Sequence, residues 1–124
     1  MSEREEIQGN AGKRTHDVVF DLLRERVASG RVMDIPCGHG VFTKRLVDAG
    51  YSVVAADVEC VIDVDGVEFQ RADMNHDLPL ESDSLDAAIC IEGIEHLERP
   101  VDFVRECGRV VKPGGWIVIT TPNT

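Results

Sequence analysis

One segment, residues 32–40, constrains the fold of this chain more than any other. A short apolar run leads to Asp34, then to a loop with two glycines, Gly38 and Gly40, and then to an amphipathic segment over residues 41–49. This order predicts a strand, a tight turn and the start of a helix. Glycine lacks the Cβ atom that would keep a ligand from the backbone, and free N–H groups at a helix N-terminus favour a carboxylate or phosphate. We therefore expect the loop to hold a nucleotide-like cofactor.

Strand and helix patterns alternate along the chain from residue 16 onward. Apolar residues at helical spacing predict helices over residues 16–27, 41–49 and 101–111. Compact apolar runs predict strands over residues 32–35, 52–56, 67–71, 85–91 and 116–121. Such alternation predicts a parallel sheet with right-handed crossovers. We expect an α/β fold: a Rossmann-like, doubly wound, mainly parallel five-stranded sheet in the order 3-2-1-4-5, with helices on both faces.

Four residues mark the carboxyl ends of successive predicted strands: Asp34, Asp57, Asp73 and Ile91. In open α/β sheets, ligands bind beyond the carboxyl ends of the strands, at the point where the strand order reverses. We therefore expect these four positions to meet at one rim of the sheet, beside the glycine loop.

The acidic charge of the chain is concentrated in one stretch. The net charge is −10 over 124 residues, and ten acids lie between Asp57 and Asp86 against a single base, Arg71. Such a field repels nucleic-acid phosphates, so we expect no nucleic-acid partner. The length fits one domain. We expect a flexible polar arm over residues 1–14 and a single core over residues 15–124.

We expect this chain in the cytoplasm. Its cysteines form no C-x-x-C pair, so neither a structural zinc site nor a disulfide framework is expected; they are Cys37, Cys60, Cys90 and Cys107. No apolar run reaches the roughly 18 residues of a membrane span. The charged first residues also lack the apolar stretch of a secretory signal.

Five motifs, in this order and spacing, resemble those of the class I S-adenosylmethionine-dependent methyltransferases. They are the glycine loop of residues 34–40, the acid-ended strand of residues 53–57, the segment at 71–74, residues 85–96, and the helix-turn-strand of residues 110–119. The segments Glu-Gly-Ile-Glu-His-Leu and Thr-Thr-Pro-Asn are most similar to those of the small-molecule O-methyltransferase-like branch. The resemblance implies methyl transfer from S-adenosylmethionine, which leaves S-adenosylhomocysteine, to a hydroxyl of a small molecule.

The resemblance also implies which residues hold the cofactor. Asp57 is expected to accept hydrogen bonds from the ribose hydroxyls. Asp73 is expected to accept one from the adenine amine, with Met74 packed on the ring. Asp34 would face the cofactor ammonium, and Ile91 would offer it a carbonyl. The methionine end would lie along the loop backbone, and the remaining expected contacts are Pro36, Cys37, Gly38, Gly40 and Val58.

The chain departs from the family pattern at two places. Pro36 stands where the family more often has its first glycine, and because proline has no N–H, one backbone donor is lost. We expect binding to survive, since the two later glycines are kept. The family sheet usually has two further strands after the position of Thr121, and nothing follows Thr124 here. We expect a fragment or split domain truncated after strand 5, its exposed edge open to a second copy or a partner chain.

Methyl transfer to a hydroxyl often uses a general base, and Glu92, Glu95 and His96 are the compact candidates. At helical spacing they would share one face near the methyl donor, which makes His96 and Glu92 the expected catalytic residues. One alternative is a packed or capping histidine with solvated glutamates. Another is a divalent ion held by the three side chains. We expect no metal site, because no further ligand is evident.

Two other functions stay open at this point. The chain could bind S-adenosylmethionine or S-adenosylhomocysteine without catalysing transfer, as an inactive module or half of a split enzyme. A nicotinamide dinucleotide oxidoreductase is disfavoured, because the third glycine of G-x-G-x-x-G would fall at Thr43. The acceptor is not predicted, because the arm, loop insertions and C-terminal strands build acceptor pockets.

Overall fold

The computed structural model describes the backbone of residues 3–122 and the side chains of residues 12–122. Five strands form one sheet in the order β3-β2-β1-β4-β5, and every neighbouring pair is parallel. The strands are β1 (Arg31–Asp34), β2 (Ser52–Asp57), β3 (Glu68–Arg71), β4 (Leu85–Ile91) and β5 (Val111–Thr120). The expected fold class and strand order are confirmed.

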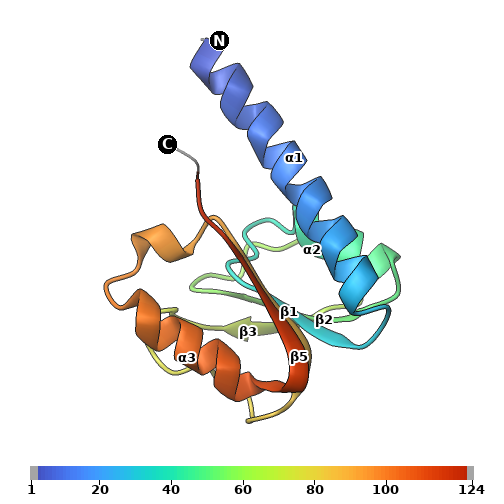
Figure 1. Cartoon of the computed structure of the whole chain (residues 1–124), viewed down its shortest axis with the longest axis vertical. Coiled ribbons are helices and arrows are strands. Elements are labelled where there is room, and N and C mark those ends of the chain that lie inside the picture. The colour runs from blue at the N-terminus through green and yellow to red at the C-terminus, as the bar shows by residue number, and fades with distance from the viewer. Residues whose placement is uncertain (1–2, 123–124) are drawn as a thin grey trace.

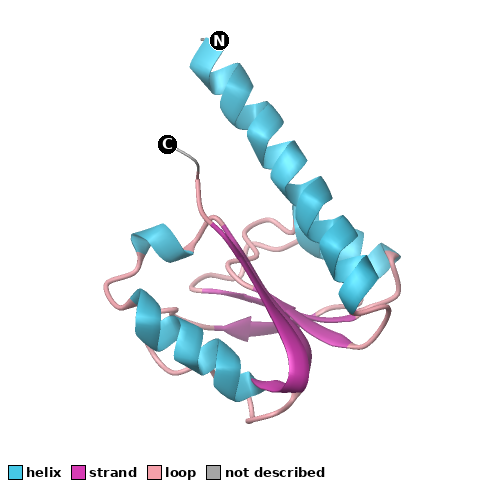
Figure 2. Ribbon diagram, in the orientation of Figure 1, coloured by secondary structure: helices cyan, strands magenta, loops and turns pink. Residues whose placement is uncertain are grey.

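Helices cover both faces of the sheet. α1 (Glu3–Arg26) and α2 (Val41–Asp48) lie on one side of β5 in Figure 1, and α3 (Pro100–Val110) lies on the other. A short 3-10 helix, η1 (Ile94–His96), follows β4. Figure 2 shows the layers by secondary structure, with the strands between the two sets of helices.

Each face of the sheet has its own apolar core. Leu23 of α1 and Leu46 of α2 are fully buried in the core of one face. Phe103 of α3 is buried in the core of the other. Successive residues of a strand point to opposite faces, so Val32 joins the first core and Met33 the second. This burial on both faces explains why the strands are continuous apolar runs in the sequence.

The first helix is longer than the sequence pattern indicates. The sequence predicts a flexible arm over residues 1–14 and a helix from residue 16, whereas the backbone is helical from Glu3. Gly9 and Gly12 suggest an arm, but a glycine inside a helix costs only about 1 kcal/mol. Their neighbours are mostly strong helix formers such as glutamate, glutamine, lysine and arginine. The flexibility of this segment stays a prediction.

β5 also begins earlier than the sequence pattern indicates. The residues 112–115, expected as a turn between helix and strand, form a bulge inside β5 instead. Leu85 lies opposite Val111, and the next pair in register is Ala87 with Trp116. The expected stop of the helix is nevertheless found there, because α3 ends at Val110.

No helix within residues 3–122 combines the length and the apolar character that crossing a bilayer requires. The four cysteines are free thiols, three of them buried and Cys60 exposed. Burial raises the pKa of the Cys37 and Cys107 thiols to about 12. These two thiols therefore stay protonated at neutral pH and pack as small apolar side chains.

Candidate functional site

Three of the predicted site residues end neighbouring strands. β1 ends at Asp34, β2 at Asp57 and β4 at Ile91, and β1 lies between the other two strands. β3 ends at Arg71, so Asp73 follows just beyond the strand. The strand order reverses between β1 and β4, which is where ligands bind in such folds. The structure therefore brings these residues to the carboxyl edge of adjacent strands.

The loop between β1 and α2 is held by backbone hydrogen bonds. The Ile35–Pro36 peptide is cis. Directly after it, the N–H of Cys37 donates to the carbonyl of Ala56 at 2.9 Å, and the N–H of Gly40 donates to the carbonyl of Cys37 at 3.0 Å. These bonds close a tight turn and tie it to the end of β2.

Both loop glycines adopt left-handed backbone values, with φ of +54° at Gly38 and +99° at Gly40. Glycine adopts such values without steric cost. A Cβ at Gly40 would lie 2.7 Å from side-chain atoms of both Ile62 and Val64, so that position also needs glycine for space. A Cβ at Gly38 would meet nothing within 4 Å. The backbone at Gly38 thus borders open space in which a ligand can approach it.

Asp57 fixes the loop with both carboxylate oxygens. Its Oδ2 accepts from the N–H of Gly38 at 2.9 Å, and its Oδ1 accepts from the N–H of Val58 at 2.7 Å. Each carboxylate oxygen can accept a further hydrogen bond. Asp57 is half-buried, so both oxygens keep the capacity to accept from a ligand with two neighbouring hydroxyls.

Asp34 is the buried acid of the site. Its side chain is 3% exposed, and its Oδ2 accepts a hydrogen bond from the hydroxyl of Thr43 at 2.6 Å. Burial raises the pKa of Asp34 to about 7; the Thr43 hydrogen bond opposes the rise and the charge of Asp57 adds to it. A cation placed beside this carboxyl would favour its ionised form. Thr43 fills the third glycine position of a dinucleotide fingerprint, and its hydroxyl is used here to hold Asp34.

A cavity of about 180 Å³ lies at the carboxyl ends of β1, β2 and β3. It brings the expected ribose acid, the expected adenine acid and three other predicted contact residues into one space. The lining residues are Ile35, Pro36, Asp57, Val58, Ala72, Asp73, Met74, Asn75 and Leu97. A second cavity of about 660 Å³ shares Met74 and Asn75 with it and continues along charged residues of α3.

Asp73 is held in place within its own turn. Its Oδ1 accepts from the N–H of Asn75 at 2.9 Å, and its Oδ2 lies 3.6 Å from Nε2 of His76. Asn75 in turn accepts the N–H of Glu98 at 3.0 Å, which links this turn to the segment before α3. The adenine-side acid is therefore positioned by local hydrogen bonds.

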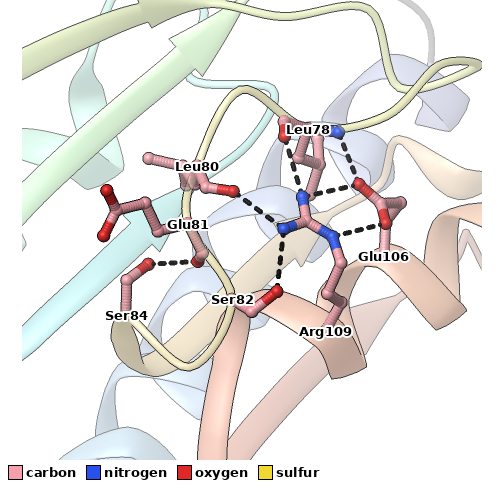
Figure 3. A network of polar contacts seen from close by, with 7 residues as sticks. All are labelled: Leu78, Leu80, Glu81, Ser82, Ser84, Glu106 and Arg109. Carbon is pink, nitrogen blue, oxygen red and sulfur yellow. Dashed lines mark hydrogen bonds and ion pairs between the residues drawn. The ribbon is translucent and has the colours of Figure 1, made fainter.

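A polar network fixes the chain after Asp73 onto α3 (Figure 3). The guanidinium of Arg109 donates to the carbonyls of Leu78 and Leu80 at 2.9 Å. It also donates to Glu106 at 2.7 Å, and Glu106 accepts the N–H of Leu78 at 2.7 Å. The hydrogen bond from Arg109 lowers the pKa of Glu106. The segment between the adenine-side acid and β4 is thereby anchored by an ionised pair.

The helical face expected for the catalytic group does not form. Glu92 has φ of +53°, and Gly93 separates it from η1. The N–H of Glu92 donates to the carbonyl and to the hydroxyl of Thr120, each at 3.1 Å. His96 has a side chain that is 80% exposed, with Nε2 3.3 Å from Glu95. The expectation of a shared face was wrong, because Glu92 belongs to the joined ends of β4 and β5.

Among the residues whose side chains are described, no three His, Cys, Asp or Glu side chains are grouped to hold a metal ion. The sequence does not predict the contacts of two other residues, Gly93 and His16. A Cβ at Gly93 would lie 2.7 Å from Cδ of Pro36, so this glycine lets the turn after β4 pack on the loop. His16 of α1 packs edge-on against Phe42, with 5.1 Å between the ring centroids. The partners of both are distant in the sequence, so no local pattern signals them.

Comparison with known proteins identifies the family. Residues 33–119 match the family described as methyltransferase domain. A protein of Mycolicibacterium smegmatis, named as an S-adenosylmethionine-dependent methyltransferase, is 34% identical over 115 residues, which cover 89% of this chain and 45% of that protein. The ubiquinone biosynthesis O-methyltransferase of Xanthomonas oryzae pv. oryzae is 33% identical over 118 residues, covering 86% of this chain and 49% of that enzyme. The chain thus spans less than half the length of these relatives.

Solved structures agree with this relationship. A protein from Pyrococcus horikoshii OT3 superimposes with a TM-score of 0.72 at 28% identity, covering 87% of this chain and 54% of that one. An S-adenosylmethionine-dependent methyltransferase from Mesorhizobium loti gives a TM-score of 0.63 at 26% identity, covering 69% and 44%. The chain belongs to the class I S-adenosylmethionine-dependent methyltransferase family.

Proposed function

We propose that this chain binds S-adenosylmethionine at the carboxyl edge of its sheet and that its domain serves methyl transfer to a hydroxyl of a small molecule. The observation that carries this proposal is the cavity at the ends of β1, β2 and β3, whose lining includes both Asp57 and Asp73. Carboxylates are acceptors only, and one adenosine offers donors to both: two ribose hydroxyls and one ring amine. The family relationship supports the same cofactor.

The adenosine half would be held by the lining of this cavity. Asp57 would accept from the ribose hydroxyls while keeping its two backbone bonds to the loop. Asp73 would accept from the adenine amine, with Met74 and Val58 packing on the apolar surfaces of the nucleoside. Pro36 of the loop also lines the cavity.

The methionine half would lie along the glycine loop. The open space at Gly38 admits a ligand to the backbone, and Gly40 and Cys37 hold the turn beneath it. Asp34 lies under this loop with its carboxyl buried and hydrogen-bonded to the hydroxyl of Thr43. The carbonyl of Ile91, at the end of β4, is the proposed partner of the cofactor ammonium.

Methyl transfer requires little covalent chemistry from the protein itself. The bound cofactor supplies an activated methyl group, and the chain must align an acceptor oxygen with it and exclude water. An acidic edge suits a ligand that carries both a sulfonium and an ammonium. We propose a hydroxyl as the acceptor because several of the relatives are named ubiquinone biosynthesis O-methyltransferases.

Binding without transfer is the second candidate function. The histidine that the sequence offers as a base, His96, is 80% exposed and paired with Glu95. An exposed histidine is poorly held for proton transfer, and this favours binding of the cofactor without transfer. Transfer of a labelled methyl group separates this candidate from the first.

We propose that a second copy or a partner chain covers the edge formed by β5, and that the chain acts in the cytoplasm. β5 is the last strand in the order of the described sheet, and Trp116 on it is 40% exposed. A Haloferax volcanii methyltransferase, 26% identical with a TM-score of 0.62, is described in complex with the Trm112 activator. Sedimentation of the purified chain distinguishes a monomer from a dimer. The free thiols support a reducing compartment.

Calorimetric titration with S-adenosylmethionine, S-adenosylhomocysteine and NAD tests the proposed function. We expect both sulfur ligands to bind and NAD not to bind. Binding of NAD and of neither sulfur ligand would instead indicate a dinucleotide-binding protein. Absence of binding by both sulfur ligands would reject the proposed function.

A further inference from the structure

α1 carries a histidine, His16, that packs against the start of α2. Figure 1 shows α1 running alongside α2, with its N-terminal half extending beyond the carboxyl end of β5. His16 is half-buried. Its ring packs edge-on against Phe42, with 5.1 Å between centroids and 63° between the ring planes. Phe42 is the second residue of α2 and follows the glycine loop directly, so His16 lies against the start of that helix.

The charges around His16 come from three elements. Burial lowers the pKa of the imidazole and the charge of Arg45 on α2 lowers it further, while Glu92 beyond β4 and Asp17 on α1 oppose the change. Arg45 is fixed by an ion pair with Asp17 at 2.6 Å and lies over the ring of Phe20, 4.2 Å from its centroid. The imidazole is therefore neutral at pH 7, and a neutral imidazole can accept a proton.

Glu92 lies beside the point where the strand order reverses. It follows Ile91 at the end of β4, and its backbone is fixed on Thr120 of β5. The next residue, Gly93, packs on Pro36 of the loop. Phe42, against which His16 packs, lies in the first turn of α2 directly after the loop, so His16 lies beside the loop proposed for the methionine half of the cofactor.

The other histidines lack this position. The chain has four: His39 is exposed, the side chain of His76 is 77% exposed, and that of His96 is 80% exposed. Of the four, only His16 is half-buried, packed against Phe42 at the start of α2. We propose that His16, held against Phe42 beside the glycine loop, is the base that accepts the proton of the acceptor hydroxyl. This assignment rests on the proposed function and replaces His96 in the acceptor-side role.

The step balances without a further reagent. A lone pair of the acceptor oxygen forms the bond to the methyl carbon as the carbon–sulfur bond breaks, and that electron pair stays on sulfur as a thioether. The proton of the hydroxyl passes to the imidazole of His16, which later releases it to solvent. Glu92 favours the imidazolium in the interval, because an opposite charge stabilises the charged form.

Nuclear magnetic resonance with S-adenosylmethionine labelled with ¹³C at its methyl group tests this assignment without a known acceptor. We expect a nuclear Overhauser contact between that methyl group and the ring protons of His16, and its loss in His16→Gln. We also expect the pKa of His16 to be lower with S-adenosylmethionine than with S-adenosylhomocysteine, because only the former places a sulfonium charge nearby. A purely structural histidine would show neither the contact nor this difference.

The outcomes separate the two proposals. Binding of S-adenosylmethionine with a methyl contact to His96, or to no histidine, overturns the assignment of His16 and leaves the cofactor site intact. Failure of both sulfur ligands to bind in the calorimeter overturns the cofactor site and the assignment together. A pKa of His16 that is the same with S-adenosylmethionine and with S-adenosylhomocysteine overturns its role as the base.

Discussion

Replacing Asp34 by asparagine is expected to remove one component of the pH dependence of stability in the ligand-free chain, the loss of stability that the ionisation of Asp34 causes as the pH rises through about 7. Burial raises the pKa of Asp34 from 3.8 to about 7 in the folded chain. A group with a raised pKa holds its proton more tightly in the folded state than in the unfolded state. Its contribution to stability is therefore complete below the unfolded value and is lost as the pH rises through about 7.

The magnitude follows from the same two values. A difference of about three in pKa corresponds to about 4 kcal/mol, since each pKa unit is worth about 1.36 kcal/mol. Between pH 5 and pH 8 the expected loss is about 3 kcal/mol, which is large against a total stability of roughly 5–15 kcal/mol. The side chain is 3% exposed, so solvent screens little of this effect. Asparagine keeps an acceptor for the Thr43 hydroxyl and cannot ionise.

Urea unfolding followed by circular dichroism at several pH values measures this effect. Subtracting the unfolding free energy of Asp34→Asn from that of the wild type removes the contribution of the groups that both share. From pH 5 to pH 8 this difference should fall by about 3 kcal/mol, because only the wild type loses stability through Asp34. Asp65→Asn removes an exposed carboxylate and controls for the loss of one charge. Parallel pH profiles for the wild type and Asp34→Asn would refute a buried, neutral Asp34.

Three further predictions follow from the contacts of the site. Asp57→Ala is expected to weaken binding of S-adenosylmethionine at least tenfold, about 1.4 kcal/mol, with the circular dichroism spectrum unchanged; unchanged affinity in calorimetry rejects the ribose role. Gly40→Ala should lower stability by about 1–3 kcal/mol, and more than Gly50→Ala, because both positions have positive φ but only Gly40 lacks space; equal losses in thermal unfolding would contradict this. Glu106→Gln should cost about 1–3 kcal/mol by weakening the Arg109 network; an unchanged melting temperature would show that the network is dispensable.

The sheet and its edge are predictable because their signals are local. β4 has the bounds expected from its run of apolar residues, and Asp34 and Asp57 end their strands as expected. Once strands and helices alternate, the parallel order places these carboxyl ends side by side. The pairing of Asp57 and Asp73 in one cavity therefore follows from the sequence through the fold.

Other features depend on contacts between distant segments, and the sequence does not predict them. Helical spacing suggests that Glu92 joins His96 on one face, but a positive φ at Glu92 turns the chain before η1 begins. His16 lies in a helix whose amphipathic pattern predicts burial against the sheet, but this pattern does not predict the contact of His16 with Phe42. The buried state of Asp34 likewise arises from packing that no short motif encodes.

A crystal structure of the chain with S-adenosylhomocysteine tests the central claim most directly. We expect the ribose hydroxyls on the carboxylate of Asp57, the adenine amine on Asp73, and the ammonium near Asp34. A ligand seated elsewhere on the chain, or at this edge with its ribose away from Asp57, would contradict the account.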